Sequence, residues 1–150
     1  MNIRKNTLLA AAVAMGFISS AAPAMARNAA PARAVTHGVV NGHPYETAGL
    51  SRQEVSALNR DRKDYDLRMS FTDGWRHARL NNVKVDVYDS AHKDVFSLAD
   101  ARARTYVQLP PGNYRIVARA GGIERSKQVN VKPGASAHVS LHWPGSVAKA

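Results

Sequence analysis

Residues Leu109 to Tyr114, with the sequence LPPGNY, constrain the fold of this chain more than any other stretch. A β-prone run ends at Leu109 and an alternating run begins at Tyr114. Neither proline can donate a backbone hydrogen bond to a sheet, so a strand must end at Pro110. Gly112 can take a positive φ and so supply the turn. The stretch therefore predicts a corner between two strands of a β-sandwich.

Seven short segments around this corner alternate apolar with polar residues. They cover residues 65–72, 83–87, 95–98, 105–109, 114–120, 124–131 and 137–143, with turn residues between them. Each segment has one apolar face, which an open sheet would leave in water. We therefore expect an all-β fold over residues 65–143, a seven-stranded antiparallel β-sandwich of prealbumin-like or Ig-like type.

One short helix is predicted before the sandwich, within residues 49–64. Ser51 and Glu54 have the spacing of a capping box, and Leu50 and Val55 would form a hydrophobic staple at the helix start. The apolar stripe of this helix is narrow, so we expect the helix to rest on the sandwich rather than lie inside it.

Two further segments lack any periodicity. Residues 27–48 are rich in Ala, Pro, Gly and Asn, which predicts a flexible linker. Residues 144–150 follow the last alternating segment and are predicted to form a fraying tail. A single domain is therefore expected to carry the core.

The start of the chain has the three parts of a secretory signal peptide. Arg4 and Lys5 give a positive start, residues 8–18 form a short apolar run, and Ala24-Met25-Ala26 is a small-x-small cleavage site. The apolar run is too short to span a bilayer comfortably. Residues 1–26 are therefore predicted to be removed on export, leaving a periplasmic or secreted protein with no transmembrane segment.

The chain is strongly basic and contains no cysteine. Its 21 Lys and Arg against 11 Asp and Glu give a formal net charge of +10. Such a charge favours anionic neighbours, which for an exported protein means an envelope protein or an anionic envelope polymer rather than nucleic acid. The alternative is that the charge serves solubility alone. Without cysteine, neither disulfides nor thiolate metal sites can form.

Three stretches together resemble a known family. They are Leu80–Tyr88, the Leu109–Tyr114 corner, and Val129–Val131 followed by Pro133-Gly134. The region resembles the carboxypeptidase regulatory-like domain, a transthyretin-like sandwich, as found in small exported proteobacterial proteins with a short helix before it. The resemblance implies a non-catalytic accessory role, and it brings no peptidase site with it.

Candidate ligand-binding residues cluster in one loop. Trp75 lies there among Arg76, His77 and Arg79, where an aromatic ring beside hydrogen-bonding groups could hold a sugar. Trp75 could instead cover the end of the core, which we favour because large aromatic residues are mostly buried. Trp143 ends an apolar strand face and is predicted to be core.

No constellation of residues predicts catalysis, a metal or a cofactor. His138 and His142 are the closest histidine pair, but on a strand they lie about 13 Å apart. No serine has a nucleophile-elbow setting, and no glycine pattern fits a phosphate or dinucleotide loop. The chain is therefore predicted not to be an enzyme.

Four basic residues crowd the hairpin that follows the proline corner. Arg115, Arg119, Arg125 and Lys127 could bind an anion, or they could protect a sheet edge from aggregation, which we favour.

The register of this hairpin has two solutions. A two-residue turn at Gly121-Gly122 would place Tyr114 opposite Val129 and Lys127 beside the core. A four-residue loop would place Tyr114 opposite Val131 and move Lys127 toward the hairpin tip. A buried unpaired lysine costs several kcal/mol, so we predict the wider loop.

The sequence thus predicts an exported protein of the cell envelope that acts as a non-catalytic accessory or interaction module. The alternative is a binding module for a glycan or an anionic envelope polymer, using Trp75 and its basic neighbours.

We expect the exported protein to begin at Arg27, because signal peptidase cleaves after a site such as Ala24-Met25-Ala26. Intact-mass measurement on protein recovered from the envelope or the medium checks this. Retention of residues 1–26 in that material would contradict it.

Overall fold

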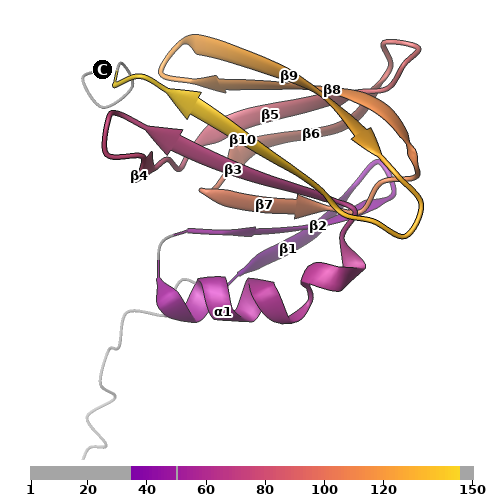
Figure 1. Ribbon diagram of the computed structural model, residues 1–150, viewed down its shortest axis with the longest axis horizontal. Coiled ribbons are helices and arrows are strands. Elements are labelled where there is room, and N and C mark those ends of the chain that lie inside the picture. The colour runs from indigo at the N-terminus through magenta and orange to yellow at the C-terminus, as the bar shows by residue number, and fades with distance from the viewer. Residues whose placement is uncertain (1–34, 50, 146–150) are drawn as a thin grey trace, which may run out of the picture.

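The structure is a computed structural model that describes residues 35–49 and 51–145. The described chain is mostly β, with two sheets that face each other across an apolar core and one short α-helix against the larger sheet (Figure 1). The coarse prediction of an all-β, sandwich-like fold is confirmed. The predicted signal peptide, residues 27–34 and residues 146–150 lie outside the described part.

The larger sheet has six strands and the smaller sheet has four. In the larger sheet the order is β1 (Thr36–Val40), β2 (His43–Ala48), β7 (Arg104–Val107), β3 (Leu67–Asp73) and β10 (Ala137–Trp143), with β4 (Ala78–Arg79) also paired to β3. In the smaller sheet the order is β6 (Asp94–Ala101), β5 (Val83–Tyr88), β8 (Gly112–Ala120) and β9 (Ile123–Val131).

A strand occurs at each of the seven predicted positions, but the structure adds β1, β2 and β4, so the prediction of seven strands is wrong. The prediction of a purely antiparallel arrangement is wrong as well. β10 runs parallel to β3, with Ala137 opposite Leu67 and Trp143 opposite Asp73. A parallel pair needs a long crossover connection. Along the sequence, all four strands of the smaller sheet lie between β3 and β10, and they form part of that crossover.

The prediction of a flexible linker over residues 27–48 is wrong for its described part. β1 and β2 form a hairpin there, and β2 pairs with β7 as an interior strand of the larger sheet. Asn41 and Gly42 make its two-residue turn, both with positive φ (50° and 82°). An Asn-Gly pair is a strong hairpin signal, but the linker prediction rested on the Ala, Pro, Gly and Asn content and the missing periodicity of the segment.

The core forms from the inward residues of both sheets. On β3 these include Met69 and Phe71, and on β10 they include Leu141 and Trp143. Trp143 is fully buried, as predicted, and its indole Nε1 donates a 3.0 Å hydrogen bond to the Ile123 carbonyl at the start of β9. This bond satisfies the ring's polar atom and ties the two sheets together.

Helix α1 (Arg52–Arg60) begins with the predicted capping box. Ser51 Oγ accepts from the Glu54 amide at 3.1 Å, and Glu54 Oε2 accepts from the Ser51 amide at 3.1 Å. The other carboxylate oxygen of Glu54 meets Arg102 at 2.6 Å, which fixes the helix start to the turn before β7. The predicted staple partner Leu50 lies outside the described residues.

The helix covers only one half of the outer face of the larger sheet. Its buried Leu58 packs with Ala48 of β2 and Tyr106 of β7, together with Tyr65. A short 3-10 turn (Arg62–Asp64) then leads the chain into β3. Among residues 35–49 and 51–145, no helix or further strand packs on the outer face of β3 and β10.

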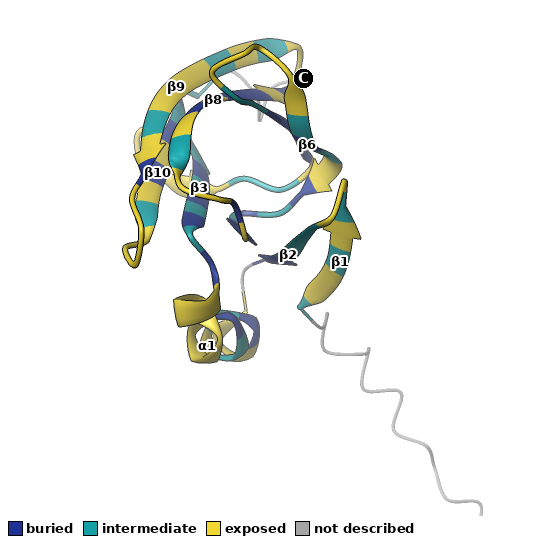
Figure 2. Ribbon diagram, turned by 90° about the vertical axis from the view of Figure 1, so that its right-hand side faces the viewer, coloured by how far each residue is buried: buried dark blue, intermediate teal, exposed yellow. Residues whose placement is uncertain are grey.

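The predicted register of the β8–β9 hairpin is wrong. Tyr114 lies opposite Val129, and the turn is the two-residue Gly121-Gly122. The free-energy cost of burying Lys127, on which that prediction rested, is absent because β9 is an edge strand of its sheet and Lys127 is exposed there. Figure 2 shows β9 exposed or half-buried along most of its length. A lysine at an edge can extend its charged end into water.

Substituting Ser51 by alanine should destabilise the helix by about 1 kcal/mol, because the capping hydrogen bond from the Glu54 amide to the Ser51 hydroxyl is lost. Amide hydrogen exchange of residues 53–60 measures this directly. Ser56→Ala removes an exposed serine from the same helix and is the matched control. Equal exchange in the two variants would contradict a capping role.

Glu54→Gln should destabilise the protein most at neutral pH. Burial alone would raise the pKa of Glu54, but hydrogen bonds from Ser51 and Arg102 outweigh it and lower the pKa below the ordinary 4.5. The ionised carboxylate therefore stabilises the fold above about pH 4.5, and this contribution disappears as the pH falls further.

Urea unfolding of both proteins at several pH values checks this prediction. The gap between wild type and Glu54→Gln should be widest near pH 7 and should close in acid. Glu124→Gln, at a half-exposed ion pair with Arg119, should change stability little at any pH. A gap that stays constant with pH would contradict the assignment.

Candidate functional site

The uncovered half of the larger sheet presents a polar surface, which we call the basic platform. Because side chains alternate along a strand, the residues between the core positions of β3 and β10 face outward. The in-register parallel pairing sets them in rows across the two strands. The rows are Arg68 beside His138, Ser70 beside Ser140, and Thr72 beside His142.

Hydrogen bonds between the strands hold two of these rows in place. Ser70 Oγ and Ser140 Oγ are 2.9 Å apart, and Thr72 Oγ1 lies 3.0 Å from His142 Nδ1. These contacts restrict the side-chain rotamers before any ligand arrives. The platform is therefore preorganised.

The β3–β4 loop adds the predicted ligand-binding residues to one end of the platform. Its first residues are fixed by Asp73, which is buried and whose Oδ1 accepts from the Gly74 and Gly145 amides at 2.8 and 2.9 Å. The Gly74 amide also donates to the Trp143 carbonyl at 2.8 Å. The loop is thus tied to the end of β10.

Trp75 does not cover the core, so the interpretation we favoured from sequence is wrong. Its side chain is 81% exposed, and the guanidinium of Arg76 lies 4.5 Å from the centre of its ring. The ring of His77 lies 4.5 Å from the ring of His142 on β10. His77 therefore meets the platform at one end, and Trp75 and Arg76 precede it in the same loop.

Arg79, the fourth predicted residue, lies on β4, which pairs with the edge of β3 that faces away from β10. It is opposite Thr72 in the β3–β4 pair, so it shares the outer face. With Arg52 and Asn59 of the helix, Arg79 lines a hollow of about 280 Å³ between α1 and β4. The structure thus sets Arg79 apart from Trp75, Arg76 and His77.

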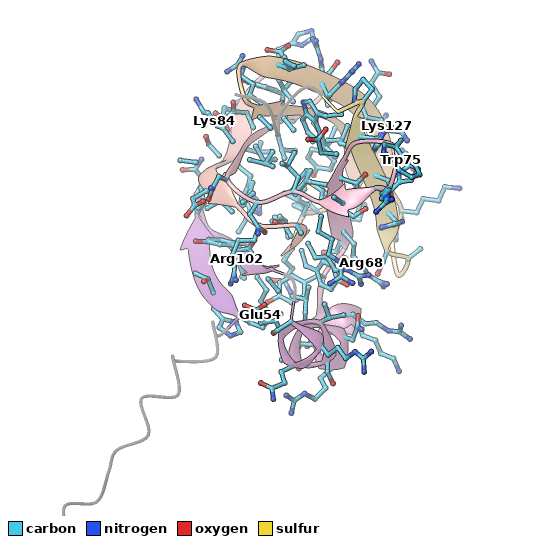
Figure 3. All side chains as sticks on the ribbon, turned by 90° about the vertical axis from the view of Figure 1, so that its left-hand side faces the viewer. Glu54, Arg68, Trp75, Lys84, Arg102 and Lys127 are labelled. Atoms are coloured by element: carbon cyan, nitrogen blue, oxygen red, sulfur yellow. The ribbon has the colours of Figure 1, made fainter. Side chains whose placement is uncertain are left out.

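Arg68 stands at the opposite end of the platform from Trp75. Its guanidinium carbon lies 6.0 Å from the ring centre of Tyr106, whose hydroxyl donates to Asn59 of the helix at 3.4 Å. The Nε atom of Arg68 is buried without a hydrogen-bond partner. Figure 3 shows Arg68 and Trp75 on the same side of the molecule, with Lys84 and Arg102 on the other.

The platform carries positive charge and hydroxyl groups, and none of its outward residues is acidic. Its cations are Arg68, Arg76 and Arg79. It also contains three histidines, His77, His138 and His142. Such a set donates hydrogen bonds and attracts anions.

The basic hairpin β8–β9 does not form a second patch of this kind. Arg115 and Arg119 pair with Gln128 and Glu124 across the ladder, whereas Arg125 and Lys127 pair with Ala118 and Ile116. The four cations therefore divide between the two faces of the sheet, because directly opposite residues share a face. Arg119 is also neutralised by Glu124 at 2.8 Å, which raises the Arg119 pKa.

Two tyrosines with raised pKa values belong to the packing rather than to a reaction centre. Burial raises the pKa of Tyr65, and the neighbouring Glu46 carboxylate adds to the effect. Burial likewise raises the pKa of Tyr114, whose hydroxyl donates to the Pro110 carbonyl at 2.6 Å. Neither hydroxyl is suited to lose its proton near neutral pH.

One pair of residues has the H-x-x-E spacing of a zinc peptidase, namely His43 and Glu46. They lie on a strand, where residues three apart face opposite sides. His43 Nδ1 contacts the Gln108 carbonyl at 3.1 Å, and Glu46 contacts His37 at 2.9 Å. Within residues 35–49 and 51–145, no three His, Asp or Glu side chains are placed to hold a metal.

The structure places three further residues in the site that were not predicted to belong to it, namely Arg68, Thr72 and His142. The signal available in the sequence was the outward half of each alternating strand. The strand order decides which outward faces lie side by side. Along the sequence, all the strands of the smaller sheet lie between β3 and its parallel neighbour β10.

Comparison with known proteins gives no family for this chain: neither a known protein family nor a curated protein matches it. In the part of the chain that the structure describes, no helix has both the length and the apolar character needed to cross a membrane.

Proposed function

We propose that this protein is an exported, non-catalytic module of the cell envelope that holds an anionic polymer or charged glycan on the basic platform. The observation that carries the proposal is Trp75, which is 81% exposed on a loop fixed at its base and stacked with Arg76. Its place of action would be the periplasm or the outside of the cell, as the predicted signal peptide implies.

The exposed ring is the feature that separates this proposal from a merely soluble basic surface. Only Val39 and Trp75 are large apolar side chains with high exposure in the described part, at 66% and 81%. An open indole ring offers a flat apolar face for a sugar ring, and a neighbouring guanidinium can bind a carboxylate or phosphate in two-point contact. Together they suit a polymer that is both sugar and anion.

The length of the platform supports an extended ligand. From Arg68 to Asp73 the strand advances by five residues, which corresponds to about 17 Å, and Trp75 lies beyond its end in the β3–β4 loop. Hydroxyl groups of Ser70, Thr72 and Ser140 lie between the two cationic ends. The resemblance to the carboxypeptidase regulatory-like domain agrees with a role in holding a partner rather than transforming it.

Trp75→Ala should weaken binding of the mature protein to cell-wall fragments and to lipopolysaccharide at least about tenfold, the equivalent of one stacking contact. Val39→Ala is the matched control, because Val39 is also a large exposed apolar residue but lies on the edge strand β1. Sedimentation with the fragments and titration calorimetry measure the binding.

A series of salt concentrations and anionic lipid vesicles complete the test. Binding through the platform should remain saturable and dependent on Trp75 at high salt. Binding that vanishes with salt, occurs equally to vesicles and is identical in Trp75→Ala and Val39→Ala would contradict the proposal, because it would reflect net charge alone.

A further inference from the structure

A second hollow lies in the other sheet, at the end of the molecule where the β5–β6 turn projects (Figure 1). Its volume is about 620 Å³, within the usual range of small-molecule sites. One wall is the turn around Asp89 and His92, and the other side is formed by the start of β8 and the end of β9. None of the basic platform residues lines it.

The wall formed by the turn is fixed by its own hydrogen bonds. Asp89 Oδ1 accepts from the amides of Ala91 and Lys93, both at 2.9 Å, and the Asp89 amide donates to the Lys93 carbonyl at 2.9 Å. The carboxylate of Asp89 is therefore used within the turn.

Strand β8 extends into the hollow beyond the end of its neighbour. Its pairing with β5 ends at Arg115 opposite Tyr88, whereas its pairing with β9 continues to Gly112 opposite Val131. Residues 112–114 therefore have a ladder partner on one side only. Because alternate residues of an antiparallel strand point their backbone groups to opposite sides, some backbone N–H and C=O groups here face the hollow.

A pair of side-chain amides adds a matched donor and acceptor. Asn130 Nδ2 donates to Asn113 Oδ1 at 2.6 Å, which leaves the Asn113 amino group and the Asn130 carbonyl oxygen for other partners. The result is the same whichever amide donates to the other. One free donor beside one free acceptor is the complement of an acetamido group, which carries a carbonyl and an N–H.

The remaining lining indicates a neutral ligand. Tyr114 and Val129 also line the hollow, although their side chains lie on the core side of the sheet, opposite to those of Asn113 and Asn130. Arg115 and Asp89 contribute one charge of each sign. This balance contrasts with the basic platform, where no outward residue is acidic.

We propose that this hollow, which we call the amide hollow, binds a neutral sugar residue that carries an acetamido group. The acetamido group pairs with Asn113 and Asn130, and the sugar hydroxyls reach Arg115, Gln128 and the open backbone of β8. This goes beyond the function proposed for the platform and depends on different residues.

The test is a titration of ¹⁵N-labelled mature protein with N,N′-diacetylchitobiose, followed through the side-chain amide signals of Asn113 and Asn130. Cellobiose and the unacetylated glucosamine disaccharide are the matched ligands without acetamido groups. We expect saturable shifts with the acetylated sugar, and at least tenfold weaker binding of both other sugars.

Asn130→Ala should abolish the saturable shifts, whereas Ser126→Ala, an exposed position on the same strand outside the hollow, should keep them. Asn113→Asp, which retains the shape but replaces the free donor, should also lose binding. Trp75→Ala should bind as wild type does.

Three outcomes would overturn the proposal. They are the absence of shifts up to the solubility limit of the sugar, equal binding of the three disaccharides, and shifts confined to the platform. Shifts of the β8 backbone with an extended peptide and not with the sugar would assign the hollow to a protein partner and equally reject it.

Discussion

The in-register parallel pairing of β3 with β10 is the constraint on which the rest of the structure depends. One side of the pair supplies Phe71 and Trp143 to the core, and the other side supplies the rows of the basic platform. Since side chains alternate along each strand, a slip by one residue in either strand would exchange core and platform positions. The burial of Trp143 and its bond to Ile123 therefore fix the register of the binding surface as well as the core.

Both proposed surfaces occur where a sheet lacks the cover that it has elsewhere. Helix α1 shields the β2–β7 half of the larger sheet and stops short of β3 and β10 (Figure 2). In the smaller sheet, β5 ends at Tyr88 while β8 continues. In each case the fold is stable without the missing neighbour, because core residues lie on the opposite side. The uncovered side is then free to carry side chains chosen for binding.

The strands and the helix cap could be predicted from the sequence because alternation and the Ser51–Glu54 pair are local signals. Three features could not. The β1–β2 hairpin depends on its pairing with β7, although Asn41-Gly42 marks its turn. The exposure of Lys127 depends on β9 being an edge strand. Of the site, Trp75 and its neighbours were visible as a cluster, whereas His142 required knowledge of which strand lies beside β3.

The distance along the chain between the two platform strands has a consequence for the order of folding. Ser70 and Ser140 touch although 70 positions separate them. Contacts of such long range form late and slowly, because a large loop must close before they contribute. Most of the smaller sheet, with its short β5–β6 and β8–β9 hairpins, can assemble first. The basic platform, and with it the proposed binding of an anionic polymer, would therefore be complete only once the last strand is in place. A chain that is still emerging or partly folded has no complete platform.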